Sequence, residues 1–309
     1  MNEGHDNRHM NSHTVLTGTV ALTHWGVIRA QGDDAVSFLQ GQLTQDVAKL
    51  DASRAALAGY CSPKGRLLAS FVICKPAAGE VLLLCHHSVL AATLKRLQMF
   101  VMRAKCKLTD ATAELPLFGA VGDAAVALMG DLPVWGRSEN RMRWPDSEGL
   151  ARAVLIDANA PLSPSLSLEN WQWLEVRSAI ATIEAATVDQ FVPQMLNYEQ
   201  LGGVNFQKGC YPGQEIVARS QFRGTIKRRA YLFEIDGPVS VGQEVFHSSD
   251  AAQPAGLVVN VARNPNGDGF SALVEVKMAT LESGSLHVGL TEGAALKLQA
   301  LPYAMTLEI

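Results

Sequence analysis

The sequence lacks the features that would place it in a specialised class. Aromatic residues make up 6% of the chain and charged residues 18%, and the net charge of −4 excludes a polycation that binds nucleic acid through bulk charge. The longest apolar runs, such as 81–85, are far too short to cross a bilayer. Residues 1–13 are polar, so they are expected to form a disordered tail and not a signal peptide. The 48% hydrophobic content indicates a soluble globular protein with a sizeable core.

The cysteine pattern gives no support for a resident metal site. The chain has no Cys-x-x-Cys pair and no Cys/His ligand pair, so neither a zinc nor an iron–sulfur site is expected. An odd number of scattered cysteines fits free thiols in a reducing cytoplasm. Apolar neighbours predict that Cys74 and Cys85 are buried, whereas Cys61 and Cys210 have polar, glycine-containing neighbours and could be exposed.

The stretch 205–219 concentrates chemically active side chains. Lys208 and Cys210 lie two residues apart, and Pro212-Gly213 predicts a turn before a short helix over 214–219. A thiol close to a lysine and just before a helix N-terminus is favoured as the thiolate. The same residues also fit a solvated turn with a buried, inert cysteine, and this stretch alone does not choose between the two.

The first two thirds of the chain predict an α+β fold. Strands and helices are mixed without a regular βα alternation and without a Gly-x-Gly-x-x-Gly loop, which argues against a doubly wound sheet. Residues 55–61 and 67–74 form a predicted hairpin across the turn 62–66. Ser88 is expected to cap a helix, and helical spacing predicts a long helix over 168–183.

The chain changes character from residue 227 onward. Short apolar or alternating segments separated by turns predict a small β-barrel or sandwich. Four cations just before and at its start are either a solvated linker or an anion-binding rim, and they could contact RNA: Arg223, Lys227, Arg228 and Arg229.

Taken together, several runs closely resemble one family. The most specific is Lys-Gly-Cys-Tyr-Pro-Gly-Gln-Glu at 208–215, and on this run the chain resembles the YgfZ family of folate-binding proteins. The resemblance covers nearly the whole chain after the tail. Supporting runs are Phe-Leu-Gln-Gly-Gln-Leu-Thr at 38–44, Ser-Pro-Lys-Gly-Arg at 62–66, Phe-Val-Pro-Gln at 191–194, Leu-Gly-Gly-Val-Asn-Phe at 201–206, Val-Ala-Arg at 217–219 and Leu-Pro-Tyr at 301–303.

The resemblance implies a fold and a function. The family is similar to the glycine-cleavage T-protein, an aminomethyltransferase, which implies ferredoxin-like α+β subdomains around a central folate pocket and a C-terminal β-barrel. Residues 14–224 would then form the folate-binding α+β domain, with two subdomains, and residues 225–309 the barrel. The implied role is assembly or maintenance of iron–sulfur proteins, including enzymes that modify tRNA, with tetrahydrofolate or a derivative as cofactor.

The resemblance also implies site residues. Trp25 and Trp173 match the two tryptophans that look like folate contacts, and a flat pterin stacking on indole gains roughly 0.5–1.5 kcal/mol beyond area burial. Without the resemblance, both indoles fit ordinary core packing. Cys210 is the expected functional thiol, with Lys208 beside it. The other residues assigned to folate, whose glutamate tail is anionic, are Lys64, Arg66, Gln214, Glu215 and Arg219.

Two departures from the T-protein pattern speak against an aminomethyltransferase. The catalytic aspartate pair is missing, because Ala69 and Ser70 stand at the corresponding positions after the hairpin turn. The Glu-Ala-Gly of the later helix is replaced by Ala-Ile-Ala at 179–181, although Glu175 one helical turn earlier could take over at the pterin edge. Proton transfer at folate nitrogens needs a carboxylate.

Three functions therefore stay open. The first is a folate-dependent accessory factor for iron–sulfur proteins, in which Cys210 holds a transient cluster or persulfide, or attacks as a thiolate. The second is one-carbon transfer with tetrahydrofolate. The third is a folate-binding or RNA-binding module without catalysis, supported only by the cations between 223 and 229.

Overall fold

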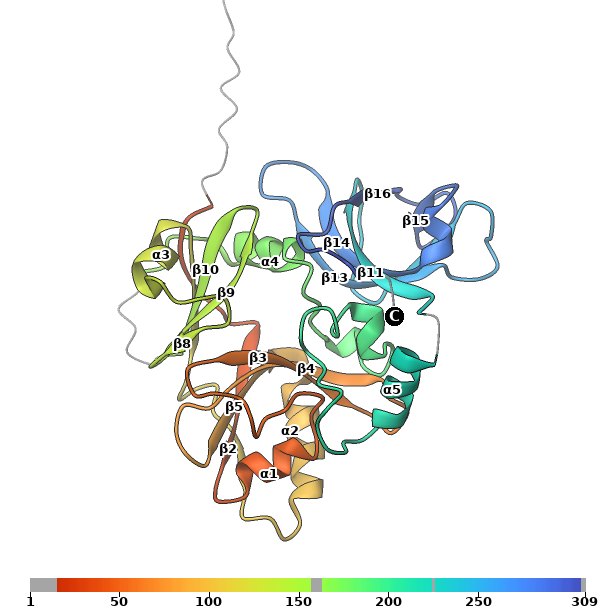
Figure 1. The fold of residues 1–309 in the computed structure, drawn as a ribbon. Helices are drawn as coiled ribbons and strands as arrows, with labels where there is room; N and C mark the ends of the chain where they lie inside the picture. Colours follow the sequence, from red (N-terminus) through yellow and green to blue (C-terminus); the bar gives the residue numbers. More distant parts are fainter. Residues whose placement is uncertain (1–15, 157–162, 224–225, 307–309) are drawn as a thin grey trace, which may run out of the picture.

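The structure, a computed structural model, describes residues 16–156, 163–223 and 226–306. The expected tail at 1–13 and the expected domain boundary at 224–225 lie outside these residues, so both stay predictions. Within the described ranges the chain forms three antiparallel sheets, each with at least one helix packed against it (Figure 1). None of the helices there has the length and apolar character needed to cross a bilayer.

The first sheet has the strand order β3-β4-β5-β2-β6. Strands β2, β4, β5 and β6 with helices α1 and α2 follow the ferredoxin-like βαββαβ pattern, and β3 is added at the edge. The predicted hairpin β3–β4 is confirmed residue for residue. The bounds are β2 Trp25–Gln31, α1 Ala35–Gln40, β3 Ala55–Cys61, β4 Leu67–Cys74, β5 Glu80–His86, α2 His87–Val101 and β6 Lys107–Asp110.

Helix α2 begins two residues earlier than expected. The ring of His86 accepts a hydrogen bond from the Ser88 backbone N–H, so His86 and not Ser88 is the cap. The helix buries Val89, Leu90 and Leu97 against the sheet.

The second sheet has the order β1-β7-β10-β9-β8, with β1 from the start of the chain at its edge. Helix α4 begins where Ser167 caps the Asn170 N–H. It ends at Arg177 and not at residue 183 as predicted, because Ala179 is left-handed with φ 53°. The bounds are β1 Gly18–Ala21, β7 Leu117–Val121, α3 Asp123–Met129, β8 Arg137–Ser138, β9 Arg141–Ser147, β10 Leu150–Ile156 and α4 Leu168–Arg177.

The third sheet has the order β15-β12-β13-β14-β11-β16. A bridge between His287 and Ala295 joins β15 to the residue before β16, so the sheet curls on itself as the predicted barrel does. The bounds are β11 Arg228–Ile235, β12 Glu244–His247, β13 Gly256–Arg263, β14 Phe270–Lys277, η3 Met278–Leu281, β15 Leu286–Val288 and β16 Leu296–Gln299.

The segment between the second and third sheets holds short helices only. Residues 178–213 are mostly irregular, and they run across the middle of the molecule in Figure 1 before the short helix α5. The bounds here are η1 Ala185–Thr187, η2 Pro193–Leu196 and α5 Gln214–Phe222.

Residues 300–306, which we call the C-terminal strap, return from the third sheet to this central segment. The Tyr303 hydroxyl donates to the Ala179 carbonyl at 2.9 Å and accepts from Asn197 Nδ2 at 3.2 Å. Further along, the Gln200 side chain exchanges two hydrogen bonds of 3.2 Å with the backbone of Thr306. The strap therefore fixes the chain just after α4.

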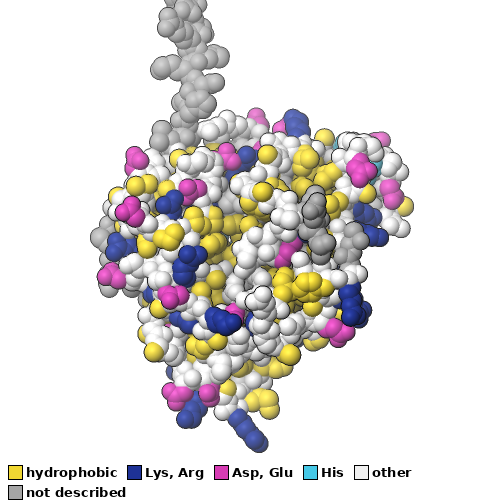
Figure 2. All heavy atoms as spheres, in the orientation of Figure 1, with side chains coloured by type: hydrophobic (Ala, Val, Ile, Leu, Met, Phe, Trp, Pro, Cys, Tyr) yellow, Lys and Arg dark blue, Asp and Glu magenta, His cyan; other side chains and the backbone are white. Residues whose placement is uncertain are grey.

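The surface carries both signs of charge. On the face in Figure 2, Lys and Arg side chains alternate with Asp and Glu, and hydrophobic atoms reach the surface between them. No broad single-sign field covers this face.

Candidate functional site

The centre of the candidate site is the carboxylate of Glu175 on α4. One of its oxygens accepts hydrogen bonds from Trp25 Nε1 at 2.8 Å and Trp171 Nε1 at 2.7 Å. The other oxygen is 2.7 Å from His24 Nε2. The first sheet, through His24 and Trp25, is thereby tied to α4, which lies between the second and third sheets.

The Glu175 carboxyl is held in its ionised form. Burial alone would raise its pKa, but the neighbouring His24 and the hydrogen bonds from His24, Trp171 and Trp25 outweigh burial and hold the pKa below its ordinary value. An ionised carboxylate only accepts hydrogen bonds. His24 therefore carries a proton on Nε2 and donates it to Glu175.

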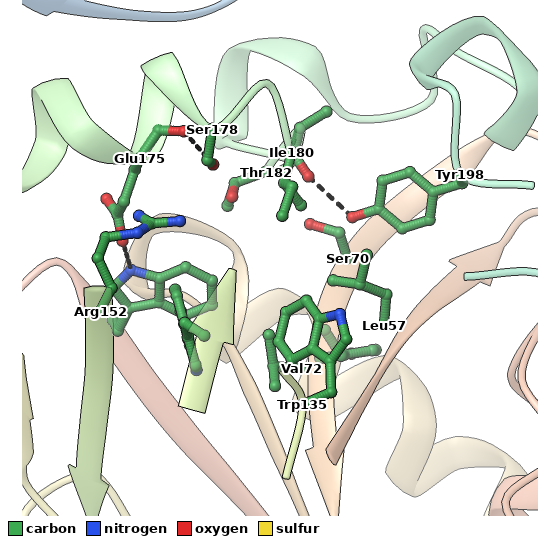
Figure 3. Close-up of a pocket in the computed structure, with 14 residues that line it drawn as sticks. Leu57, Ser70, Val72, Trp135, Arg152, Glu175, Ser178, Ile180, Thr182 and Tyr198 are labelled. Atoms are coloured by element: carbon green, nitrogen blue, oxygen red, sulfur yellow. Dashed lines mark hydrogen bonds between the residues drawn. The ribbon is translucent and has the colours of Figure 1, made fainter. Parts of the chain in front are cut away.

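A first cavity, which we call the aromatic cavity, lies beside this carboxylate. Its walls include the indoles of Trp25, Trp135 and Trp144. In Figure 3, Arg152 and Glu175 lie on one side of it, and Ser70 and Tyr198 on the other. Its free volume is about 20 Å³, which holds a single water molecule. A larger guest requires the wall side chains to move.

Two polar groups of this cavity have no partner among the described residues. Arg152 is 1% exposed, and its Nε donates to the Pro145 carbonyl at 2.9 Å, but its Nη1 donates to nothing. The indole N–H of Trp144 is also buried without an acceptor. Burial lowers the pKa of Arg152 to about 10, so it stays a cation at neutral pH. Each unpaired buried donor costs about 1–3 kcal/mol, which a ligand acceptor would recover.

A second cavity, which we call the polar cavity, adjoins the first and has a free volume of about 110 Å³. It is lined by His24, His86 and Glu184, and by Asn260 from the third sheet. Burial lowers the pKa of His86 to about 4 and raises that of Glu184, so both groups are more easily neutral here than in water. The two cavities share Trp25, Glu175, Ile180 and Thr182 as lining residues.

The position of the missing aspartates lies on the wall of the aromatic cavity. Ser70 lines it, and its hydroxyl accepts the Ile183 backbone N–H at 2.8 Å. On the same side, the Tyr198 hydroxyl donates to the Ala181 carbonyl at 2.8 Å. This part of the wall is occupied by hydrogen bonds between protein groups, and it offers no carboxylate.

Of the two tryptophans assigned from the sequence, the structure places only Trp25 at the cavities. The indole N–H of Trp173 points to the third sheet, where it donates to Asn264 Oδ1 at 3.1 Å and Ser271 Oγ at 3.0 Å. Trp173 lines neither cavity, and its role as a folate contact stays a prediction. Trp171, which sequence reasoning missed, is the indole that shares Glu175 with Trp25.

The Cys210 loop lies apart from both cavities. Cys210 is exposed, whereas Lys208 is buried at 7% exposure. Lys208 Nζ donates to the carbonyls of Gln40 and Leu43, the latter at 2.6 Å, and lies 4.9 Å from the Tyr211 ring centre. Burial lowers the pKa of Lys208 to about 8. Lys208 thus anchors the loop to the end of α1 while Cys210 stays accessible.

The turn 62–66 packs against the start of α5. A Cβ on Gly65 would lie 2.8 Å from Ile216 Cβ, and a Cβ on Gly213 would lie 2.4 Å from the Ser62 carbonyl, so only glycines allow this contact. Two of the motifs that carried the family resemblance therefore meet in space.

The other cations and polar residues predicted for folate gather around this contact. Lys64 is exposed, and Arg66 donates to the backbone carbonyls of Asp189 and Gln190. Glu215 and Arg219 are exposed and pair with each other at 3.3 Å, and Gln214 is the first residue of α5. They line neither cavity, so their contact with folate stays a prediction.

An open groove adjoins the aromatic cavity. It has a volume of about 460 Å³ and is lined by Lys49, Arg54 and Asn205, the residue at which the Cys210 stretch begins. Trp135 and Leu57 line both this groove and the aromatic cavity. Trp135 is left-handed, with φ 62°, a conformation that non-glycine residues rarely adopt outside functional or tightly constrained sites.

The predicted cationic rim is only partly free. Arg228 Nη2 donates to Glu275 Oε2 at 2.8 Å, and Arg229 Nη1 is 2.6 Å from Glu199 Oε1, with both side chains of the second pair 3% exposed. These two arginines stabilise the fold, and because each is paired with a carboxylate, neither presents a free positive charge to RNA. Arg223 and Lys227 are exposed.

Replacing Arg229 with Met is expected to lower the free energy of unfolding by about 3–5 kcal/mol, because Glu199 would stay buried without its cation. Urea unfolding monitored by circular dichroism measures the change. Arg223→Met is the matched control and should alter stability by less than about 0.5 kcal/mol. Equal stability of the two variants would contradict the structural role of Arg229.

Comparison with known proteins places the chain in a class by its fold. It is similar to the glycine cleavage system aminomethyltransferase T from Bartonella henselae, with a TM-score of 0.69 over 93% of this chain and 86% of that one. The identity is 16%, so the likeness concerns the fold alone. The protein thus has the aminomethyltransferase T-protein fold, as the sequence predicts.

The curated relatives define the family. The chain is 30% identical to the tRNA-modifying protein YgfZ of Sodalis glossinidius (strain morsitans) over 95% of each chain. It is 34% identical to the tRNA-modifying protein YgfZ of Edwardsiella ictaluri (strain 93-146) over 71% of each. The chain therefore belongs to the YgfZ family, which confirms the resemblance drawn from its motifs. No protein-family model matches it.

Proposed function

We propose that the chain binds tetrahydrofolate and serves the assembly or maintenance of iron–sulfur proteins in the cytoplasm, including enzymes that modify tRNA. The observation that carries the proposal is the aromatic cavity, with indole walls around buried polar groups that have no protein partner. Small-molecule sites are typically apolar and aromatic, with a few convergent polar groups.

The residues present fit a folate ring. A pterin is flat and carries both N–H donors and carbonyl or ring-nitrogen acceptors, so it suits a site that contains unpaired Arg152 and Trp144 donors beside Glu175 and His24. Stacking on Trp25 would supply roughly 0.5–1.5 kcal/mol beyond area burial. Because the free volume is small, binding must widen the cavity, and Trp135 on the wall shared with the open groove is the side chain in place to do so.

The name of these relatives, tRNA-modifying protein, supports a role in tRNA modification for this chain. An exposed Cys210 on a loop anchored by Lys208 supports a functional thiol that reaches a partner protein. No group of three or more His, Cys, Asp or Glu side chains in the described ranges is arranged to hold a metal ion. A cluster at Cys210 would thus be transient or shared with the partner. RNA contact remains a proposal for Arg223 and Lys227.

Calorimetric titration with tetrahydrofolate under anaerobic conditions tests the proposal. We expect saturable binding, and we expect Trp25→Ala to weaken it at least about tenfold, since lost stacking and lost burial together exceed 1.4 kcal/mol. Lys297→Ala, which removes an exposed ion pair with Asp236 on the third sheet, is the control and should bind like the wild type. Absence of saturable binding by the wild type would overturn the folate proposal. Trp173→Ala in the same titration tests the second tryptophan.

A further inference from the structure

We propose that His24 is a specificity residue of the ligand site, whose Nδ1 accepts a hydrogen bond from an N–H group of the bound folate. The inference rests on the proposed function and adds to it a named recognition atom. Neither the residue nor its contact follows from the sequence motifs, which contain only the neighbouring Trp25.

The tautomer of His24 is fixed by its partner. The hydrogen bond of 2.7 Å between His24 Nε2 and Glu175 requires the ring proton to be on Nε2, because the carboxylate can only accept. In the neutral ring the other nitrogen, Nδ1, is then an acceptor. His24 Nδ1 is buried and has no partner among the described residues.

The groups around His24 leave this acceptor for a ligand. The nearest ring is that of His86, with the centroids 6.0 Å apart, and His86 Nδ1 is already engaged with the hydroxyl and backbone N–H of Ser88. Across the polar cavity, Asn260 Nδ2 donates to Glu184 Oε1 at 2.8 Å and to the Thr182 carbonyl at 2.9 Å. Neither these groups nor Gln172, which also lines the polar cavity, hydrogen-bonds to His24 Nδ1.

The unpaired hydrogen-bond donors and the unpaired acceptor lie in different cavities. Unpaired donors, Arg152 Nη1 and Trp144 Nε1, lie at the aromatic cavity, and the unpaired acceptor, His24 Nδ1, lies at the polar cavity. Glu175 lines both and separates them. A matching ligand places carbonyl or ring-nitrogen acceptors toward Arg152 and an N–H toward His24. In a folate this N–H belongs either to the 2-amino pyrimidine edge, present in every redox form, or to a ring nitrogen that is protonated only in the reduced form.

Two isosteric replacements separate the two nitrogens of His24. Gln can retain a donor near the place of Nε2 and hence the contact with Glu175, but it has no acceptor at Nδ1. Asn can retain an acceptor near Nδ1 but loses the bond to Glu175. Calorimetric titration of the wild type, His24→Gln and His24→Asn with tetrahydrofolate and with folic acid isolates the Nδ1 contact, and urea unfolding without ligand verifies that each variant is folded.

We expect His24→Gln to weaken tetrahydrofolate binding about tenfold, the loss for one buried hydrogen bond, and His24→Asn to bind more tightly than His24→Gln. A larger loss for tetrahydrofolate than for folic acid assigns the donor to a reduced ring nitrogen, and an equal loss assigns it to the amino edge; both support the proposal. If the wild type binds tetrahydrofolate and a folded His24→Gln binds it equally well, the His24 contact is overturned while folate binding stands. If the wild type binds neither ligand, the proposed function fails first.

Discussion

Replacing Glu175 with Ala is expected to lower the free energy of unfolding by about 3–5 kcal/mol, because three buried donors lose one shared acceptor. Those donors are the indole N–H groups of Trp25 and Trp171 and the imidazole N–H of His24. Since Glu175 ties the first sheet to α4, the loss should also widen the cavities. Urea unfolding monitored by tryptophan fluorescence measures the loss of stability, and the emission maximum before unfolding reports the change around the cavity indoles.

The same carboxylate predicts a dependence on pH. A group whose pKa is lowered on folding stabilises the protein above its unfolded pKa, near 4.5 here, and loses that contribution as the pH falls through the lower folded value. The stability difference between the wild type and Glu175→Gln should therefore be constant at neutral pH and shrink below pH 4.5. Glu215→Ala, in an exposed pair with Arg219, is the control and should change stability by less than about 0.5 kcal/mol. A difference that grows toward acid pH would contradict an ionised Glu175.

Cys210→Ala is expected to abolish the biological activity without affecting the fold. Its thiol is exposed, so its removal leaves no cavity, and no described contact depends on it. In a strain that lacks its own YgfZ protein, we expect this variant to restore iron–sulfur enzyme activity no better than an empty vector. Wild-type chain in the same strain sets the upper limit.

Two further measurements decide what a loss at Cys210 means. Tetrahydrofolate affinity should be unchanged in Cys210→Ala, because Cys210 lines neither cavity. Cys210→Ser should also fail, since a serine hydroxyl neither forms a persulfide nor ionises like a thiol. Full complementation by either variant would remove the thiol from the proposed function.

Local patterns predicted the framework of the fold well. The hairpin 55–61 and 67–74 has long apolar segments around a Pro-Lys-Gly turn, and both strands form as expected. Motifs also identified the family, because the run at 208–215 is specific enough to indicate the family by itself. These signals are local in sequence, so no knowledge of tertiary contacts was needed.

The site could not be derived in the same way, because it depends on which side of an element faces its neighbours. Trp171 and Trp173 are two residues apart and point to different sides of α4, one to Glu175 and one to the third sheet. Only the packing of three sheets decides between them. The spacing of Trp171 and Glu175, four residues apart on one helical face, was a signal that could have suggested their pairing.

Cys61 illustrates the same limit. Its polar, glycine-containing neighbours are compatible with an exposed side chain. The structure nevertheless buries Cys61 to 1% exposure, and burial raises its pKa to about 12. The turn after it is covered by the start of α5, a segment about 150 residues later in the chain. A contact between segments so far apart in the sequence leaves no recognisable pattern in the residues around Cys61.

During synthesis, the C-terminal strap can bind the segment after α4 only long after that segment has been made. The Ala179 carbonyl after α4 receives its hydrogen bond from Tyr303, a residue 124 positions later. At about 5–20 residues per second, a ribosome needs roughly 6 to 25 seconds between the two. Throughout that interval Glu175, His24 and both indoles already exist, but the segment that follows them is not yet fastened. The segment after α4 therefore lacks this hydrogen bond until the third sheet and residue 303 have been synthesised.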